Sequence, residues 1–487
     1  MKYLNELNRI ISMNVGFTMM VKGMPGSGKT TFLLTLSDYL KDSYEIIYFS
    51  TRVNVDILYN QFPWLKSLEK KISLVISSQA LLKILYENNL KEKNKENLRQ
   101  NAKEVISNTV EEKMITRIFY NKYFKMKSVP EIDYIYKKLE EDTNKKHIVI
   151  IDSIEGLASK YNIDEESLVI SLQEDIFKKT NDIFIFSVEK TEESSLDALC
   201  DVILEFSYDI EETRRIRKLR INKLRNTHID NSLYLFSLNE GRFNILKPNI
   251  QENYEEGSFK PVLEDNENFK LPWNEINEVL GNGLEKGKTL TFYFCENISY
   301  GDYSFIIIPI ILNSLNNRKL IYIPSPIVSR DFYFNTLKKY FDDSIILNNS
   351  YLFDKDARER EKSIVPLSHN PYDLKITLKN IIQENSMNKI VIIINVDTLE
   401  LIFGTNKSNE IIMDIIRMIK IYSVPLILLV RYPFKMADEI LQMSDYVFNV
   451  KNNFGTLTIY GIRPSTNLFG LEIDDGKYPN LRLIPIV

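Results

Sequence analysis

The sequence predicts an α/β protein with two tandem domains of one fold, each built on a mostly parallel central sheet. Short, continuously apolar runs alternate with helical patterns, which is typical of parallel strands covered on both faces. A glycine-rich stretch, VKGMPGSGKTT, follows the first of these runs at residues 21–31. Six segments of the first half also recur in the same order in the second half, which indicates a duplication.

Length and composition favour a soluble globular protein. The chain has 487 residues, enough for two or three domains. Its net charge of −4 provides no overall basic field for nucleic acid. The two cysteines, Cys200 and Cys295, lie far apart in the chain, so a reducing cytoplasm is the expected compartment.

No segment predicts a membrane anchor. The N-terminus, MKYLNELNRIISMN, is too polar for a signal peptide. The longest apolar runs, FIIIPIIL and KIVIIINV, fall well short of the roughly 20 residues that span a bilayer. We expect the first to be a buried helix and the second a buried parallel strand.

The expected domain boundaries follow the order of strands. The first half predicts strands at FTMMVKG, EIIYFS, HIVIIDS, DIFIFSV and DVILEF, and an antiparallel pair at KLRINKLR and NSLYLFSL. The predicted domains are 1–241, with a helical insertion at about 78–145, and 269–487, joined by a polar linker at 242–268. The Lys, Glu and Asn of the insertion favour solvated helices over a partner-binding arm.

The stretch at residues 23–30 satisfies the phosphate-loop pattern GxxxxGK[ST]. Its glycines let several backbone N–H groups face one anion, and the helix from Thr31 points its positive end at the phosphates. Lys29 is expected to reach the β- and γ-phosphates of ATP, and Thr30 to bind Mg²⁺. The predicted nucleotide site comprises Gly23, Met24, Pro25, Gly26, Ser27, Gly28, Lys29, Thr30, Thr31, Asp152 and Ser153.

Asp152 ends the apolar run HIVIID, and Ser153 follows it. A carboxylate at the tip of a buried strand beside the loop can hold a water bound to Mg²⁺. We therefore predict Thr30 and Asp152 as the magnesium-binding residues.

A basic segment spans residues 214–225. It is open to three interpretations: a solvated strand face, a surface for acidic protein or nucleic acid, or a contribution to a neighbouring subunit's nucleotide. For the third, Lys223 and Arg225 project from one face of a strand and could neutralise the γ-phosphate.

With these motifs in place, the chain resembles the RecA-fold ATPases of the KaiC type. Their strand pattern LxIxKxRGTxH is similar to LRINKLRNTH here, although Asn226 replaces the glycine and His228 comes one residue early. NEVLGNGLEKGKTLTF in the second half is similar to the family's LGGGxxxG lead-in. The resemblance implies tandem RecA-like P-loop domains.

Within that superfamily the chain resembles the archaeal gas vesicle protein GvpD type of regulators. The loop and STRVNVDILYNQFPW, residues 50–64, carry this resemblance. It implies an ATP-binding protein that restrains a transcriptional activator by direct contact, with basic segments that matter for repression.

One departure concerns hydrolysis. KaiC-type ATPases place two glutamates after the second strand, where this chain has Ser50, Thr51 and Arg52. Glu155 and Glu189 are the alternative candidates for the general base, and a structural role on the surface is the competing interpretation for both. We therefore expect hydrolysis to be slow or to depend on a partner, and Arg52 is a candidate sensor of the γ-phosphate.

The second half predicts a degenerate domain without a working phosphate loop. If Gly301 aligns with the last loop glycine, Asp302 replaces the lysine, Tyr303 the hydroxyl and Glu296 the first glycine. Asn395 replaces the magnesium-site aspartate, and Gly461 replaces the lysine at the position of Lys223. Arg463 survives, and our hypothesis is that it approaches the first domain's ATP; a plain exposed arginine is the alternative.

The leading functional prediction is a nucleotide-gated regulatory protein that acts through protein contacts, and both a monomer and a homo-oligomer are open. The alternative from another class is a DNA-binding RecA-type ATPase, a recombinase or helicase relative. A third is an autophosphorylating kinase, for which no residue marks an acceptor.

Overall fold

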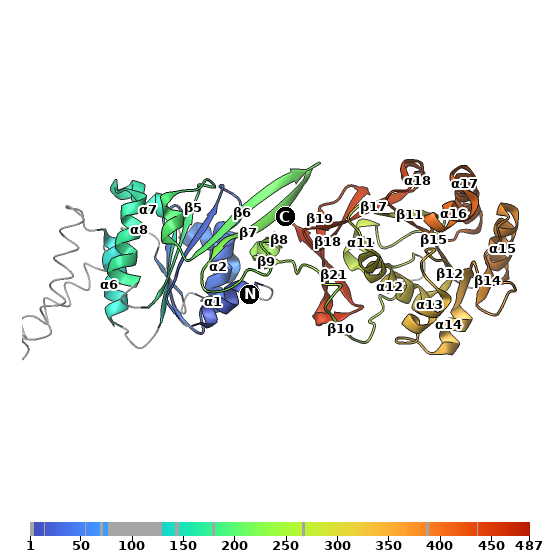
Figure 1. The fold of residues 1–487 in the computed structure, drawn as a ribbon, viewed down its shortest axis with the longest axis horizontal. Helices are drawn as coiled ribbons and strands as arrows, with labels where there is room; N and C mark the ends of the chain where they lie inside the picture. The colour runs from blue at the N-terminus through green and yellow to red at the C-terminus, as the bar shows by residue number, and fades with distance from the viewer. Residues whose placement is uncertain are drawn as a thin grey trace, which may run out of the picture. The chain divides into compact units, whose positions relative to one another are not determined.

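The computed structural model describes residues 4–13, 15–53, 55–68, 72–75, 129–141, 146–177, 181–264, 268–385, 389–435 and 437–487. The chain divides into two compact units (Figure 1). The N-terminal unit is Met1–Asp209 with Arg217–Ile245, and the C-terminal unit is Ile210–Ile216 with Leu246–Val487. Most of the predicted linker, 246–268, is thus counted with the C-terminal unit. Most of the predicted insertion, 78–128 and 142–145, lies outside the described residues.

The N-terminal unit is built on one large, mostly parallel sheet. Its strand order among the described residues is β3-β2-β4-β5-β1-β6-β7-β8-β9. The neighbours from β3 to β6 run parallel, whereas β7, β8 and β9 pair antiparallel. The strands are β1 Thr18–Gly23, β2 Glu45–Ser50, β3 Ile72–Val75, β4 His147–Asp152, β5 Ile183–Val188, β6 Val202–Glu211, β7 Arg214–Leu224, β8 Leu233–Ser237 and β9 Asn244–Ile245.

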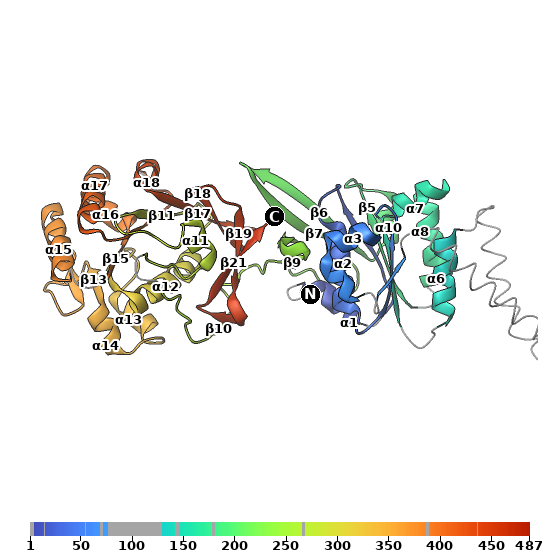
Figure 2. The ribbon, with the colours of Figure 1, turned by 180° about the vertical axis from the view of Figure 1, so that it is seen from behind.

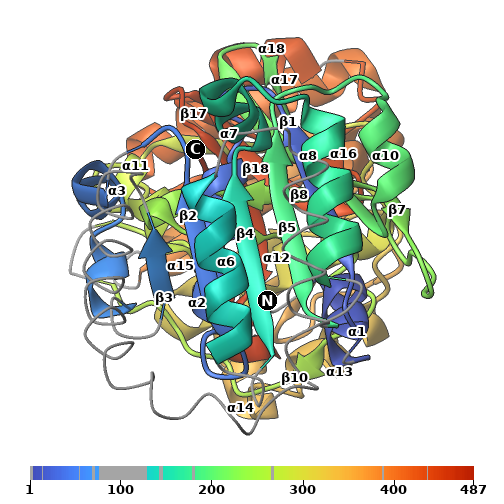
Figure 3. The ribbon, with the colours of Figure 1, turned by 90° about the vertical axis from the view of Figure 1, so that its left-hand side faces the viewer.

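Helices cover both faces of this sheet. On one face the core is filled by α1, α2, α3 and the 3-10 helix η1. Figure 2 shows α1, α2 and α3 on this side of the sheet. On the other it is filled by α6, α7, α8 and α10, and Figure 3 shows α6 and α8 in front of β4 and β5. The helices are α1 Asn5–Ser12, α2 Lys29–Leu40, α3 Val55–Gln61, η1 Pro63–Leu68, α6 Pro130–Glu141, α7 Ile154–Tyr161, α8 Glu165–Leu172 and α10 Ser195–Leu199. Coverage on both faces explains why the central strands are continuously apolar.

The C-terminal unit has a second sheet of the same kind. Its order is β14-β13-β12-β15-β16-β11-β17-β18-β19-β21 in the described part of the unit. Neighbours from β14 to β17 run parallel, and the remaining pairs run antiparallel. The strands are β11 Thr289–Phe294, β12 Lys319–Ile323, β13 Ser350–Asp354, β14 Ile364–Pro366, β15 Ile390–Asn395, β16 Leu426–Arg431, β17 Tyr446–Asn453, β18 Thr456–Arg463, β19 Leu468–Ile473 and β21 Leu481–Ile486.

Two apolar clusters again flank this sheet. One involves α11, α12, α13 and α14, and the other α15, α16, α17 and α18. These helices are α11 Asn274–Val279, α12 Tyr300–Asn317, α13 Arg330–Leu337, α14 Asp343–Asn349, α15 Pro371–Glu384, α16 Val396–Phe403, α17 Thr405–Tyr422 and α18 Ala437–Met443. FIIIPIIL lies in α12, and KIVIIINV contains β15, as predicted. Among the described residues no helix is both long and apolar enough to cross a membrane.

The two sheets confirm the repeat expected from the sequence. The order β2-β4-β5-β1-β6-β7-β8 corresponds strand for strand to β12-β15-β16-β11-β17-β18-β19. One hydrogen bond marks the register: the Thr18 amide donates to Asp201 Oδ2 at 3.0 Å, and the Thr289 amide to Asp445 Oδ2 at 2.9 Å. The chain is therefore an α/β protein with tandem, mostly parallel sheets of RecA-like organisation.

Candidate functional site

The predicted phosphate loop joins β1 to α2 in the N-terminal unit. Gly23 and Gly28 have φ values of 154° and 108°. A Cβ atom on Gly23 would lie 2.2 Å from the Phe206 carbonyl oxygen, and one on Gly28 would lie 3.0 Å from Leu238 Cδ1. Both positions therefore need glycine, for backbone conformation and for space.

The N-terminus of α2 is available to an anion. Gly28 is the N-cap residue and provides no side-chain hydrogen bond, and no acidic residue lies in the first turn. The first N–H groups of a helix have no partner within the helix, and the helix dipole adds positive potential there. A phosphate at this end of α2 would satisfy those donors.

Lys29 is folded back on its own loop. Its ammonium donates to the carbonyl oxygens of Gly23 and Met24, the second at 3.0 Å, and the residue is only 7% exposed. Burial lowers the pKa of Lys29, and the charge of Asp152 is the largest effect that opposes this lowering. A bound phosphate would supply a stronger counter-charge than these neutral carbonyls do.

The predicted magnesium residues lie together. Thr30 Oγ1 donates to Asp152 Oδ2 at 2.7 Å, and Tyr48 donates to the same oxygen at 2.8 Å. Ser187 donates to Asp152 Oδ1. Mg²⁺ in nucleotide sites is held by a carboxylate together with a threonine hydroxyl from the first turn of the helix that follows the phosphate loop. Asp152 and Thr30 provide these two groups.

Two buried polar atoms without a partner among the described residues support the fit of this site to a polar ligand. Ser27 Oγ and Glu155 Oε2 are buried and have no hydrogen-bond partner within the described chain. Buried polar atoms are normally paired, so their lack of a partner needs an explanation. The loop, Lys29, Thr30 and Asp152 would hold a nucleoside triphosphate with its Mg²⁺.

The position that carries glutamates in KaiC-type ATPases has a structural role here. Thr51 Oγ1 accepts from the Ser153 amide at 2.8 Å and donates to the Ser153 carbonyl at 3.1 Å. A Cβ atom on Gly156 would lie 2.3 Å from this hydroxyl. Thr51 therefore ties β2 to the start of α7, and Ser50 bonds its own loop through the Val53 carbonyl.

Glu155 and Glu189 occupy different environments. Glu155 lies in the first turn of α7, is 9% exposed, and accepts from the Glu189 amide through Oε1. The side chain of Glu189 forms an ion pair with Arg52, which is about half exposed. The negative charges of both carboxylates raise the pKa of Lys29 and so oppose the effect of burial. Only Glu155 keeps a buried oxygen without a partner, so it is the stronger candidate to orient a water molecule.

The remaining predicted site residues make contacts within their own units. Lys223 donates to the Asp197 carbonyl at 2.7 Å, and Arg225 pairs with Asp201 at 3.1 Å. Arg463 donates to the Ser444 carbonyl at 2.6 Å. Their roles at a nucleotide stay predictions.

One contact to the loop was missed by sequence reasoning. Arg217 donates to the carbonyl oxygens of Gly26 and Ser27 at 3.2 and 3.3 Å. In the sequence it is one cation among several in the basic segment 214–225. No local pattern signals this contact, because about 190 residues separate Arg217 from the loop.

The corresponding loop of the C-terminal unit shows that the predicted alignment was wrong by two residues. β1 and β11 each hold six residues, and the helix starts six positions after each strand ends. Ser299 therefore stands at the position of Gly28, and Tyr300 at that of Lys29. Gly301 does not correspond to Gly28, because it has no positive φ and lies inside the first turn of α12.

The helix end in this loop is closed by the chain itself. Ser299 Oγ accepts from the Asp302 amide at 3.1 Å, and the Asp302 carboxylate accepts from the Ser299 amide at 2.9 Å. This capping box satisfies the amides that a phosphate would need, and the buried Asp302 carboxylate would repel an anion. Among the described residues, the loop after β11 thus lacks the open helix end of the N-terminal loop, and Asp302 acts through the cap and not from the lysine position.

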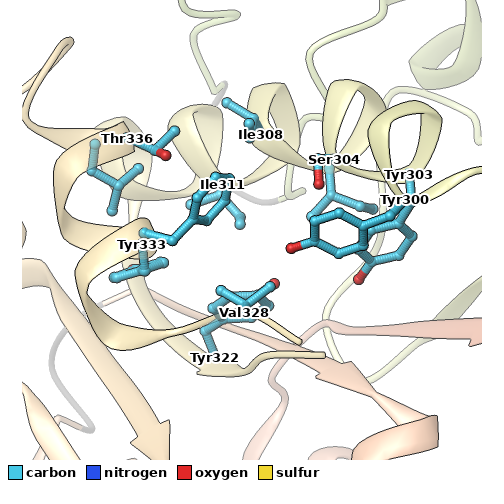
Figure 4. Close-up of a pocket in the computed structure, with 12 residues that line it drawn as sticks. Tyr300, Tyr303, Ser304, Ile308, Ile311, Tyr322, Val328, Tyr333 and Thr336 are labelled. Carbon is cyan, nitrogen blue, oxygen red and sulfur yellow. The ribbon is translucent and has the colours of Figure 1, made fainter. Parts of the chain in front are cut away.

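A tyrosine hydroxyl, from Tyr303, bonds the residue that corresponds to Asp152, although Gly301 stands at the position of Thr30. Tyr303 donates to Asn395 Oδ1, and Asn395 ends β15 as Asp152 ends β4. Beside it, between α12 and α13, lies an apolar pocket that Figure 4 shows with Tyr300, Tyr303, Tyr322 and Tyr333 around it. Its described lining includes no lysine or arginine, so it does not fit a phosphate.

Comparison with known proteins agrees with this division of the chain. Residues 7–222 match the family model described as GvpD gas vesicle protein, P-loop domain. The chain is similar to protein GvpD2 of Halobacterium salinarum, with 21% identity over 507 residues that cover 99% of this chain and 96% of the relative. It is also similar to protein GvpD1 of the same organism, with 22% identity over 320 residues that cover 64% of this chain and 54% of the relative. Residues 7–222, which include the phosphate loop described above, are therefore similar to the P-loop domain of GvpD proteins.

Proposed function

We propose that this protein is an ATP-binding regulator of the GvpD type, in which nucleotide at the N-terminal P-loop controls contacts with a protein partner. The observation that carries the proposal is the difference between the two loops. The first leaves helix amides and a buried lysine available to phosphate, whereas the second caps its own helix. One regulated site per chain suits a switch, because a ligand shifts a conformational equilibrium only by its differential affinity for the two states.

The bound group would be ATP with Mg²⁺, which would supply negative charge to Lys29 and the helix amides and a cation to Thr30 and Asp152. Lys29 would release its loop carbonyls to meet the phosphates. Thr30 and Asp152 would hold the metal. Glu155 would orient water for slow hydrolysis, in place of the glutamates that are absent after β2.

The contacts of the basic segment support a protein partner over nucleic acid. Lys218 forms an ion pair with Asp209, Arg225 with Asp201, and Arg217 is buried on the loop. Cations already bonded to carboxylates or carbonyls of the chain are less able to release counterions from a phosphate backbone. Following the family resemblance, we propose a transcriptional regulator as the partner; possible self-association through Lys223 and Arg225 belongs to the same proposal.

The proposed function is tested by co-purification from the native cell with Mg-ATP and without it. We expect a partner that associates with the unmodified chain in a nucleotide-dependent manner and loses this dependence with Lys29→Met. A partner retained equally in all conditions would contradict nucleotide control. Salt-sensitive, ATP-stimulated binding of single-stranded DNA would instead favour the recombinase-like alternative.

Asp152→Asn is expected to remove the magnesium dependence of ATP binding. Asn395 stands at this position in the C-terminal unit and accepts a hydroxyl donor there, so the amide should be tolerated. For the unmodified chain we expect chelation of Mg²⁺ to weaken ATP binding by about tenfold or more, because a carboxylate attracts the metal. In the variant the affinities with and without Mg²⁺ should be similar.

Calorimetric titrations with and without EDTA measure this effect. Asp182→Asn is the matched control, because Asp182 is buried in the same unit and bonds the His147 amide at the other end of β4. An unchanged magnesium dependence in Asp152→Asn would refute the assignment of the metal site.

A further inference from the structure

Arg217 contacts the outer side of the phosphate loop. It lies on β7, is 5% exposed, and donates to the carbonyl oxygens of Gly26 and Ser27. The guanidinium also lies 6.0 Å from the centre of the Tyr208 ring. A buried cation is costly unless its donors are used, so these carbonyls are part of what keeps it inside the protein.

The two carbonyls constrain the amides of the loop. In a trans peptide the C=O and N–H groups point in opposite directions within one rigid plane. The Gly26 carbonyl shares its plane with the Ser27 amide, which closes a turn on the Met24 carbonyl at 3.2 Å. The Ser27 carbonyl shares its plane with the Gly28 amide, which therefore points away from Arg217. By holding both carbonyls, Arg217 sets the orientation of both amides.

The internal repeat provides an independent comparison. In the repeated segments RKLRINKLRNT and GTLTIYGIRPS, Gly455 stands where Arg217 stands. The alignment agrees with burial, because Leu219 and Leu457 are both 0% exposed, and Ile221 and Ile459 are both buried. The N-terminal unit has both Arg217 and the loop glycines with positive φ, Gly23 and Gly28. The C-terminal unit, in which α12 carries a capping box, has neither at the corresponding positions.

We propose that Arg217 is a positioning residue that holds the phosphate loop in its nucleotide-accepting conformation. This proposal rests on the proposed ATP binding. Its chemistry suits arginine, because the planar guanidinium carries several donors in a fixed geometry, whereas the lysine ammonium is a flexible point charge. Lysine at this position could hold one carbonyl but would control the second less well.

The test compares Arg217→Met, Arg217→Lys and Arg220→Met in the full chain. Arg220 is exposed on the opposite face of the same strand, so it controls for the loss of one positive charge from β7. Calorimetry gives the affinity for Mg-ATP. Thermal unfolding with and without Mg-ATP gives the nucleotide-induced rise in Tm, which reports binding separately from intrinsic stability.

We expect Arg217→Met to weaken Mg-ATP binding by roughly ten- to a hundredfold, the usual consequence of losing hydrogen bonds from a charged group. Arg217→Lys should recover part of the affinity, and Arg220→Met should bind like the unmodified chain. A lower Tm for Arg217→Met without nucleotide, together with an unchanged nucleotide-induced rise, would assign Arg217 a merely structural role and overturn the proposal.

Failure of the positioning role can be told apart from failure of the proposed function. If the unmodified chain does not bind Mg-ATP, the proposed function fails, and the positioning role fails with it. If the unmodified chain binds and Arg217→Met binds equally well, only the positioning role is overturned.

Discussion

Lys29→Met should lower the affinity of the chain for Mg-ATP by about a hundredfold or more, with little change in the fold. The expected loss follows from Coulomb attraction. The interaction energy of one charge pair at contact distance near a protein surface is larger than the free energy that corresponds to a hundredfold change in affinity. The folded chain should tolerate the change, because burial already disfavours the ammonium and methionine fills a similar volume. Titration calorimetry measures the affinity, and should find one ATP per chain before the substitution and none after it at the same concentrations.

Tyr300→Leu is the matched control for this experiment. Tyr300 stands at the lysine position of the C-terminal loop, so its replacement should leave ATP affinity and stoichiometry unchanged. Two bound nucleotides per chain, or a Lys29→Met variant that binds normally, would contradict the division of the chain into one nucleotide-binding unit and one that caps its own helix.

Glu155→Gln should slow ATP turnover by about a hundredfold while leaving ATP affinity close to that of the unmodified chain. General-base catalysis commonly contributes that much. Glutamine keeps the oxygen that accepts from the Glu189 amide, so the start of α7 should stay in place. The lost element is the negative charge of a buried carboxylate whose second oxygen has no partner in the described residues.

Glu189→Gln discriminates between the two candidate bases. Its carboxylate is engaged with Arg52 near the surface, so its loss should change turnover far less. Release of phosphate under single-turnover conditions measures both variants. If Glu189→Gln abolished turnover and Glu155→Gln did not, the roles assigned to the two residues would be reversed.

Local patterns predicted much of the fold. Continuous apolar runs predicted the central strands, and FIIIPIIL was correctly assigned to a buried helix. The order of repeated segments predicted two sheets of matching topology. These predictions succeed because burial on both faces of a parallel sheet leaves a signal in every strand.

Some residues of the candidate site could be predicted from a local sequence motif, and others could not. Gly23 to Thr30 could be found because the loop, its lysine and its hydroxyl lie within one turn and one helix start. Asp152 could be placed beside them because parallel strands end at the same edge of a sheet. Arg217 and the capping box on Ser299 were not found, because each depends on which donors meet which acceptors in space.

The sequence by itself determined that this chain repeats one α/β fold and carries a single phosphate-loop motif, because glycine spacing and strand periodicity are properties of neighbouring residues. Only the tertiary structure decided that Tyr300, and not Asp302, stands at the lysine position, and that Thr51 ties β2 to α7. It also decided that Glu155 keeps the orphaned carboxylate oxygen and that Arg217 holds the loop. These features depend on hydrogen bonds and close packing between segments that meet only after folding, and no local pattern encodes such contacts.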